Sequence, residues 1–157
     1  MRARVLLVVV GLFALAACGG SSGGSAAPSP SPSPTVDTAA ATAQITTAWE
    51  SFFKGGGTVD SHIALLEDGD KFRNELTAQA KDPNNAALTA TVKNVVINGE
   101  TAVVTYDLAG KGGTVLLPGA TGEAVQIAGT WKVAKKTYCQ LISLQDPNAQ
   151  HPACTSG

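Results

Sequence analysis

Apolar residues after position 38 recur at the spacing of one buried helix face, which predicts an amphipathic helix over Ala39–Lys54. Asp37 or Thr38 is placed to cap its N-terminus, and the run Gly55-Gly56-Gly57 is typical of a helix end. The predicted buried face consists of Ile45, Ala48, Trp49, Phe52 and Phe53.

Two shorter helical segments are predicted next. One begins at Asp60 or Ser61 and runs into the acidic turn 67–70. The other covers 71–81, with Phe72, Leu76 and Ala80 four residues apart on one face, and Asp82-Pro83 ends it.

From Leu88 the apolar positions change to the alternation of β-strands. The alternation over 88–97 loses its phase at Asn94, which predicts a β-bulge there. Asn98-Gly99 is a two-residue hairpin signal, and a return strand is predicted over 101–108.

The remaining predicted strands are short. They cover 114–117 and 123–128, separated by the turn-like residues 118–122, and then 131–136. Residues 138–144 either continue as strand or form a short helix, and the tail from Gln145 has no periodicity. Helices followed by an antiparallel meander predict an α+β fold, with the helices packed on a curled antiparallel sheet of about four to five strands.

The start of the chain has a different pattern, because Arg2 and Arg4 precede an apolar stretch over 5–17. That stretch is shorter than the ~20 residues that span a bilayer, and it is typical of a secretory signal peptide. Its end, Leu15-Ala16-Ala17-Cys18, resembles the bacterial lipobox, in which the cysteine thiol receives a diacylglyceryl group. We therefore expect cleavage before Cys18 and a palmitate-type lipid anchor; the alternative is an ordinary signal peptide with a chance cysteine.

Glycine, serine and proline dominate residues 19–38, which have too little apolar surface to form a core. The Ser-Pro repeat is typical of an extended spacer, and its hydroxyl groups are alternatively O-glycosylation sites. We therefore divide the chain into a signal peptide (1–17), a lipidated cysteine with tether (18–38) and one α+β domain (39–157).

Charge narrows the range of partners. The sequence holds 11 basic and 12 acidic residues, and two of the basic ones lie in the predicted signal peptide. Without a basic run, nucleic-acid binding is not expected. We expect the lipid anchor to attach the protein to the extracytoplasmic face of the cell membrane.

Two cysteines remain in the predicted domain, Cys139 and Cys154. Exported proteins meet an oxidising environment, so we expect a disulfide that staples the tail onto the end of the sheet. A structural zinc site needs four ligands, and only His151 lies near these cysteines in sequence, so neither a metal nor a cofactor is predicted.

Three segments together resemble a known family: "ITTAWESFF", "HIALLEDGDKF" and "AVQIAGTWKVAKKTYCQLISL". They are similar to the low-molecular-weight secreted antigens of mycobacteria and related actinobacteria. The resemblance implies a cystatin-like cone, like that of nuclear transport factor two, and a location in the cell envelope, but no reaction. The predicted anchor and the terminal cysteines depart from the plain secreted antigens, and the anchor argues against free secretion.

Five aromatic residues are expected to gather between helix and sheet. They either line a cavity for an apolar ligand, with one polar anchor from Tyr106, or fill the space as solid core. The set is Trp49, Phe52, Phe53, Tyr106 and Trp131.

No motif predicts catalysis. His62 is the one histidine of the expected domain outside its tail, and an acid–base role needs a positioned partner. The acidic residues 67–70 lack the register of a calcium loop and are interpreted as a solvated turn.

The sequence therefore predicts a non-enzymatic envelope lipoprotein that binds a small apolar ligand or an envelope partner. The alternatives are a structural module with a solid core and, less favoured, a cone-fold enzyme.

Overall fold

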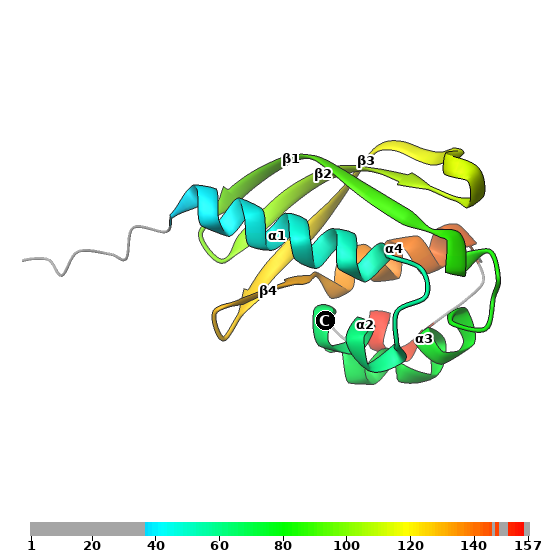
Figure 1. The fold of residues 1–157 in the computed structure, drawn as a ribbon. Coiled ribbons are helices and arrows are strands. Elements are labelled where there is room, and N and C mark those ends of the chain that lie inside the picture. The colour runs from blue at the N-terminus through cyan, green and yellow to red at the C-terminus, as the bar shows by residue number, and fades with distance from the viewer. Residues whose placement is uncertain (1–36, 146, 148–150, 156–157) are drawn as a thin grey trace, which may run out of the picture. The chain divides into compact units, whose positions relative to one another are not determined.

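Four antiparallel strands form one sheet in the order β1-β2-β3-β4, and helices lie against one of its faces (Figure 1). The strands are β1 (Thr89–Asn98), β2 (Thr101–Ala109), β3 (Val115–Ile127) and β4 (Thr130–Val133). This computed structural model describes residues 37–145, 147 and 151–155, which all belong to one compact unit, Thr35–Gly157. The predicted signal peptide, Cys18 and nearly all of the tether lie outside the described residues.

Helix α1 (Thr38–Phe53) begins where the sequence predicts, because Oδ1 of Asp37 accepts hydrogen bonds from the backbone N–H groups of Ala39 (3.1 Å) and Ala40 (3.2 Å). The helix packs against β1 and β4. Its predicted apolar face is buried except for Ala48, which is half-buried.

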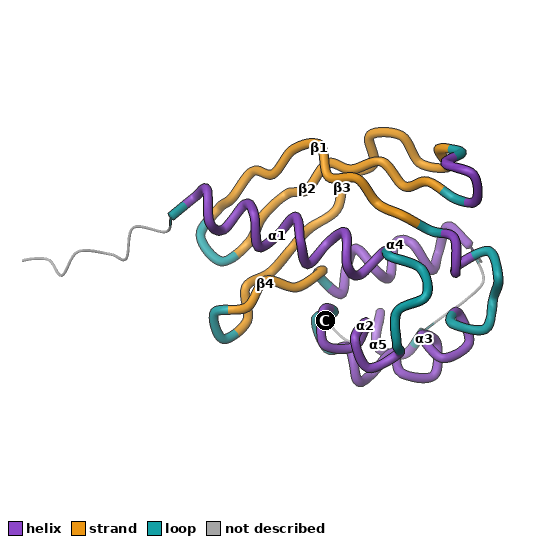
Figure 2. The backbone as a smooth tube through the Cα atoms, in the orientation of Figure 1, coloured by secondary structure: helices purple, strands orange, loops and turns teal. Residues whose placement is uncertain are grey.

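Helices α1 and α4 (Lys135–Gln145) cover the sheet, while the short helices α2, α3 and α5 gather at one end of the domain, where α2 contacts α1 and β4 (Figure 2). Their bounds are α2 Val59–Leu65, α3 Arg73–Gln79 and α5 Pro152–Thr155. The helix predicted over 71–81 is shorter than expected, because its start is a 3₁₀ turn, η1 (Gly69–Phe72), in which Phe72 is fully buried. The α+β prediction is confirmed.

The β-bulge is confirmed, because the pairing of β1 with β2 shifts between Val92 and Asn94. The shift returns Val95 and Ile97 to the inner face. The hairpin turn differs from the prediction by one residue: Asn98 pairs with Thr101, so its central residues are Gly99 and Glu100. A glycine with positive φ (61°) at the first central position is the arrangement of a type II′ turn.

Strand β3 is continuous where two short strands separated by a turn were predicted. Pro118 and Gly119 form an irregularity opposite Asp107, whose Oδ1 accepts the N–H of Gly119 at 2.8 Å. That bond and Lys93, 3.1 Å away on β1, lower the pKa of Asp107. The side chain of Asp107 thus replaces a ladder partner, which lets the strand pass through a Pro-Gly pair.

The predicted strand over 131–136 is also wrong at its end, because α4 begins at Lys135. Of the two alternatives for 138–144, the helix is correct. The N-terminus of α4 is capped from a distance: Oε2 of Glu67 accepts the N–H of Lys135 at 2.8 Å, and the Glu67 N–H donates to the carbonyl of Val133. Glu67 is therefore part of the fold rather than of a solvated turn.

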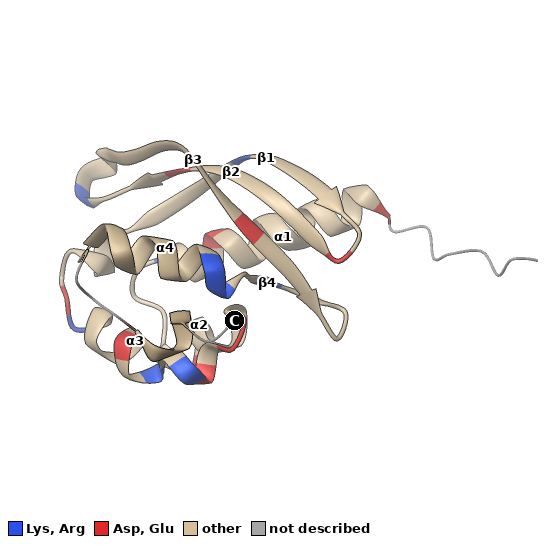
Figure 3. Ribbon diagram, turned by 180° about the vertical axis from the view of Figure 1, so that it is seen from behind, with Lys and Arg blue, Asp and Glu red and all other residues tan. Residues whose placement is uncertain are grey.

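Charged side chains gather on α2, α3 and the start of α4, and most of α4 carries none (Figure 3). Asp68 pairs with Lys71 at 2.7 Å and with Lys135 at 3.6 Å, and the hydrogen bond from Lys71 lowers the pKa of the Asp68 carboxyl. Among the described residues, no helix has the length and hydropathy needed to cross a membrane.

Candidate functional site: a trough along helix α4

The five aromatic residues predicted to gather are all buried, and four of them pack ring against ring. The ring of Tyr106 lies 5.2 Å from that of Trp49 and 5.4 Å from that of Phe53, centroid to centroid. Phe52 contacts Phe53 at 5.0 Å. Trp131 lies on β4 and borders a separate hollow of about 560 Å³ that residues of α1 also line. The space between α1 and the sheet is therefore filled.

Open space lies further along the same face, between α4, β2, β3 and the segment 85–88 that precedes β1. In the described part of the chain, three adjoining hollows of about 130, 620 and 740 Å³ occur there. Leu141 of α4 lines all three. We call this surface the α4 trough and define it by its shared lining: Leu88, Leu108, Leu117, Leu141 and Leu144.

The inner end of the trough is the 130 Å³ hollow, walled by Phe52, Phe53, Leu76 and Tyr138. An apolar cavity of roughly this size accepts a benzene-sized group. The hydroxyl of Tyr138 donates to Gln79 at 3.2 Å, and burial raises the pKa of that phenol. Two of the five predicted aromatics thus line this hollow, at a different place from the one expected.

His62 also borders the inner hollow. Its Nδ1 lies 2.8 Å from the carbonyl oxygen of Thr58, which can only accept, so Nδ1 carries the proton. Its ring contacts Phe52 at 5.8 Å between centroids. The residues described around this hollow include no carboxylate, so His62 has no acidic partner there.

The outer part of the trough opens between α4 and β3. Leu117 and Leu144 line both larger hollows, and Tyr106 forms part of the wall of the 740 Å³ one. At the rim, Leu116 and Leu144 are 54% and 68% exposed. The hollow thus has exposed leucines on both sides, and contiguous exposed apolar surface is typical of interaction sites and ligand-binding grooves.

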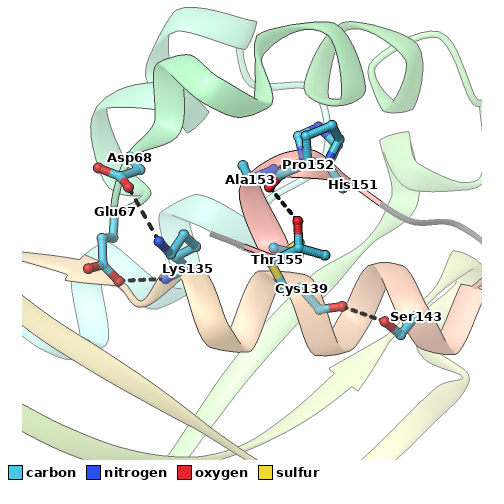
Figure 4. Close-up of a disulfide and its surroundings, with 10 residues drawn as sticks. Glu67, Asp68, Lys135, Cys139, Ser143, His151, Pro152, Ala153 and Thr155 are labelled. Atoms are coloured by element: carbon cyan, nitrogen blue, oxygen red, sulfur yellow. Dashed lines mark hydrogen bonds and ion pairs between the residues drawn. A yellow bond between two sulfur atoms is a disulfide. The ribbon is translucent and has the colours of Figure 1, made fainter. Parts of the chain in front are cut away.

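The disulfide Cys139–Cys154 is present, which confirms the predicted pairing (Figure 4). Its position differs from the prediction: Cys139 lies on α4, so the bond joins α5 to a helix and not to the sheet. The tail also makes contacts of its own, because Ala153 is buried and the ring of His151 stacks on Phe72 at 4.7 Å. Both cysteines line the 740 Å³ hollow, so the disulfide is part of its wall.

Sequence reasoning missed the leucines of the trough. Leu141 and Leu144 are three residues apart, a helical spacing, but 138–144 fits strand and helix equally. Alternation puts Leu108 on the same strand face as Tyr106 but gives no sign that the space beneath it stays open. In the described part of the chain, no three His, Cys, Asp or Glu side chains come together as metal ligands.

Comparison with known proteins identifies a family. The family model for the C-terminal domain of low molecular weight antigen MTB12 matches residues 38–149. No curated protein and no solved structure matches the chain. The matched range runs from the first residue of α1 to beyond the end of α4 and covers more than half of the sequence. The chain therefore belongs to the family of the MTB12 low molecular weight antigen C-terminal domain.

Proposed function

We propose that this protein is a lipid-anchored component of the cell envelope whose domain binds an apolar molecule in the α4 trough, without catalysing a reaction. The observation that carries the binding role is that one side chain, Leu141, lines three adjoining apolar hollows. Ligand pockets in proteins are lined mainly by apolar side chains and measure about 300–1,000 Å³, and the two larger hollows fall in that range.

The absence of an acidic partner for His62 among the described lining residues supports binding rather than acid–base catalysis. The anchor part of the proposal rests on the sequence Leu15-Ala16-Ala17-Cys18 and on membership of a family of secreted antigens. Two acyl chains give stable anchoring where one does not.

The binding role is tested with the neutral fluorescent dye Nile red, added to the full chain carrying Cys18→Ser, which removes the thiol for acylation. We expect saturable binding that Leu141→Gln abolishes. Leu65→Gln is the matched control, because Leu65 is another half-buried helix leucine but lies outside the trough. Equal binding by the parent chain and the Leu141 variant, or no saturable binding at all, would refute the role.

The anchor is tested separately by detergent phase partitioning of the protein expressed in an actinobacterial host. The unmodified chain is expected in the detergent phase and Cys18→Ala in the aqueous phase. Identical partitioning of the two proteins would show that Cys18 carries no anchor.

A further inference from the structure

The charged side chains that line the α4 trough are all basic. Among the described residues that line its three hollows there are four lysines and neither aspartate nor glutamate, although acidic residues outnumber basic ones in the whole chain. The lysines are Lys54, Lys111, Lys135 and Lys136.

The two lysines near the start of α4 are already neutralised. Lys135 lies 3.6 Å from a carboxylate oxygen of Asp68, and Lys136 lies 3.0 Å from that of Glu123. The two at the other end differ, because no described residue forms an ion pair with Lys54 or Lys111.

Lys54 and Lys111 border the same stretch of the trough. Lys54 lines the inner hollow and Lys111 the 620 Å³ hollow, and these two hollows share the side chains of Asn85, Leu88 and Leu108. An apolar group lying against Leu88 and Leu108 therefore occupies a stretch of the trough whose lining includes both Lys54 and Lys111.

The negative ends of two helix dipoles lie near these lysines, but they are too weak to cancel the lysine charges. Helix α1 ends at Phe53 and α4 ends at Gln145, so two C-termini lie near the inner hollow. Each C-terminus carries about half a negative charge, felt only within the last turn and screened at the surface, whereas each lysine carries a full charge on a side chain that moves toward a ligand.

Glu75, a carboxylate close enough to affect Tyr138 in the wall of the inner hollow, already has a hydrogen-bond partner. Glu75 is half-buried and raises the pKa of Tyr138, and its Oε1 accepts a hydrogen bond from Nε2 of Gln79 at 3.3 Å. It does not line the hollow.

We propose that the ligand of the α4 trough is a single-chain amphiphile with an anionic head, whose alkyl chain lies against the leucines and whose head is bound by Lys54 and Lys111. The trough is elongated along α4, an 11-residue helix about 16 Å long, which fits one extended chain. This inference rests on the proposed binding role and deepens it by naming the chemical class of the ligand.

The experiment measures displacement of Nile red from the full chain carrying Cys18→Ser by decanoate, 1-decanol and decyltrimethylammonium, which share one alkyl chain and differ in head charge. We expect decanoate to bind roughly five- to tenfold more tightly than 1-decanol, from two exposed charge contacts, and decyltrimethylammonium to bind most weakly. Added salt should reduce these ratios.

The double variant Lys54→Glu/Lys111→Glu is expected to reverse the order of decanoate and decyltrimethylammonium while keeping the affinity for 1-decanol. Lys132→Glu is the control, because Lys132 lies on β4 and lines none of the three hollows. Retained affinity for 1-decanol shows that the double variant is folded.

The outcomes separate this inference from the proposed binding role. Equal affinities for the three probes would overturn the claim that the ligand has an anionic head. So would an order of affinities that the double variant leaves unchanged. Either result leaves the apolar binding role standing. Displacement of bound Nile red by none of the three overturns the amphiphile as ligand, and the absence of saturable Nile red binding overturns both proposals.

Discussion

The two halves of the helix-covered sheet face are built from different side chains. Under α1, aromatic rings fill the space, and Trp49, Val104 and Tyr106 are each no more than 1% exposed. Along α4, leucines line open hollows and reach the surface. Trp49, Phe53 and Tyr106 pack ring against ring between α1 and the sheet, whereas the leucines of α4, β2 and β3 leave hollows between them. One face of the sheet is thus filled at one end and hollow at the other, and the proposed binding role belongs to the hollow end.

The largest expected effect is on the filled half. Trp49→Ala should lower the free energy of unfolding by about 3–5 kcal/mol, because it removes a fully buried ring that contacts Phe53 and Tyr106. Urea denaturation measures this loss. Since Trp49 lines none of the trough hollows, the folded fraction of the variant should still bind Nile red. A loss below about 1 kcal/mol would show that the filled half is not the stabilising one.

Loss of the disulfide is expected to have the next largest effect. Its cysteines are 15 residues apart, and chain-entropy arguments give roughly 3 kcal/mol for such a loop. We expect a Cys139→Ser/Cys154→Ser variant to show a lower melting temperature but intact near-ultraviolet circular dichroism, because the aromatic core does not contain the bond. Collapse of that signal would mean that α5 is needed for the core itself.

Gly122 tests how tightly the filled half is packed. A Cβ at this position would lie 2.6 Å from Cγ2 of Thr137 and 2.8 Å from Cη2 of Trp49. Gly122→Ala should therefore destabilise the domain by about 1–3 kcal/mol, measured by thermal unfolding beside the exposed neighbour Thr121→Ala. Unchanged stability in the Gly122 variant would show that the packing next to Trp49 has room for a methyl group.

The smallest effect on stability is expected at the rim of the trough. Leu144 is 68% exposed, so Leu144→Lys should change the free energy of unfolding by no more than about 0.5 kcal/mol. It should nevertheless weaken Nile red binding, because it places a charge where the two larger hollows meet. A variant that is clearly less stable, or that binds the dye as well as the parent chain, contradicts the proposal that the filled half stabilises the fold and the trough binds the ligand.

The sequence predicted correctly those elements that are determined by residues close together in the chain. The spacing of Ile45, Trp49 and Phe53 and the lost phase at Asn94 were enough for α1 and for the bulge. The errors arose where a distant residue decides the structure. Asp107 carries β3 through Pro118-Gly119, and Glu67, 68 residues away in the sequence, caps the start of α4.

The trough could not be predicted for the same reason. Apolar periodicity places Leu108 and Leu141 on inner faces but does not show whether the space between them is filled. That depends on the curl of the sheet and on where α4 crosses it, and both follow from contacts between residues far apart in the sequence. The disulfide was predictable because only two cysteines remained to pair.

The most direct test of the account is an amide chemical-shift titration of the full chain carrying Cys18→Ser with 1-decanol, a neutral probe that needs no charged partner. The account predicts saturable shifts at Leu88, Leu108 and Leu141, with the amides of Ile45, Trp49 and Val104 unchanged. Shifts centred on those three buried residues, or no saturable shifts anywhere, would contradict the claim that one half of the sheet face is solid and the other binds.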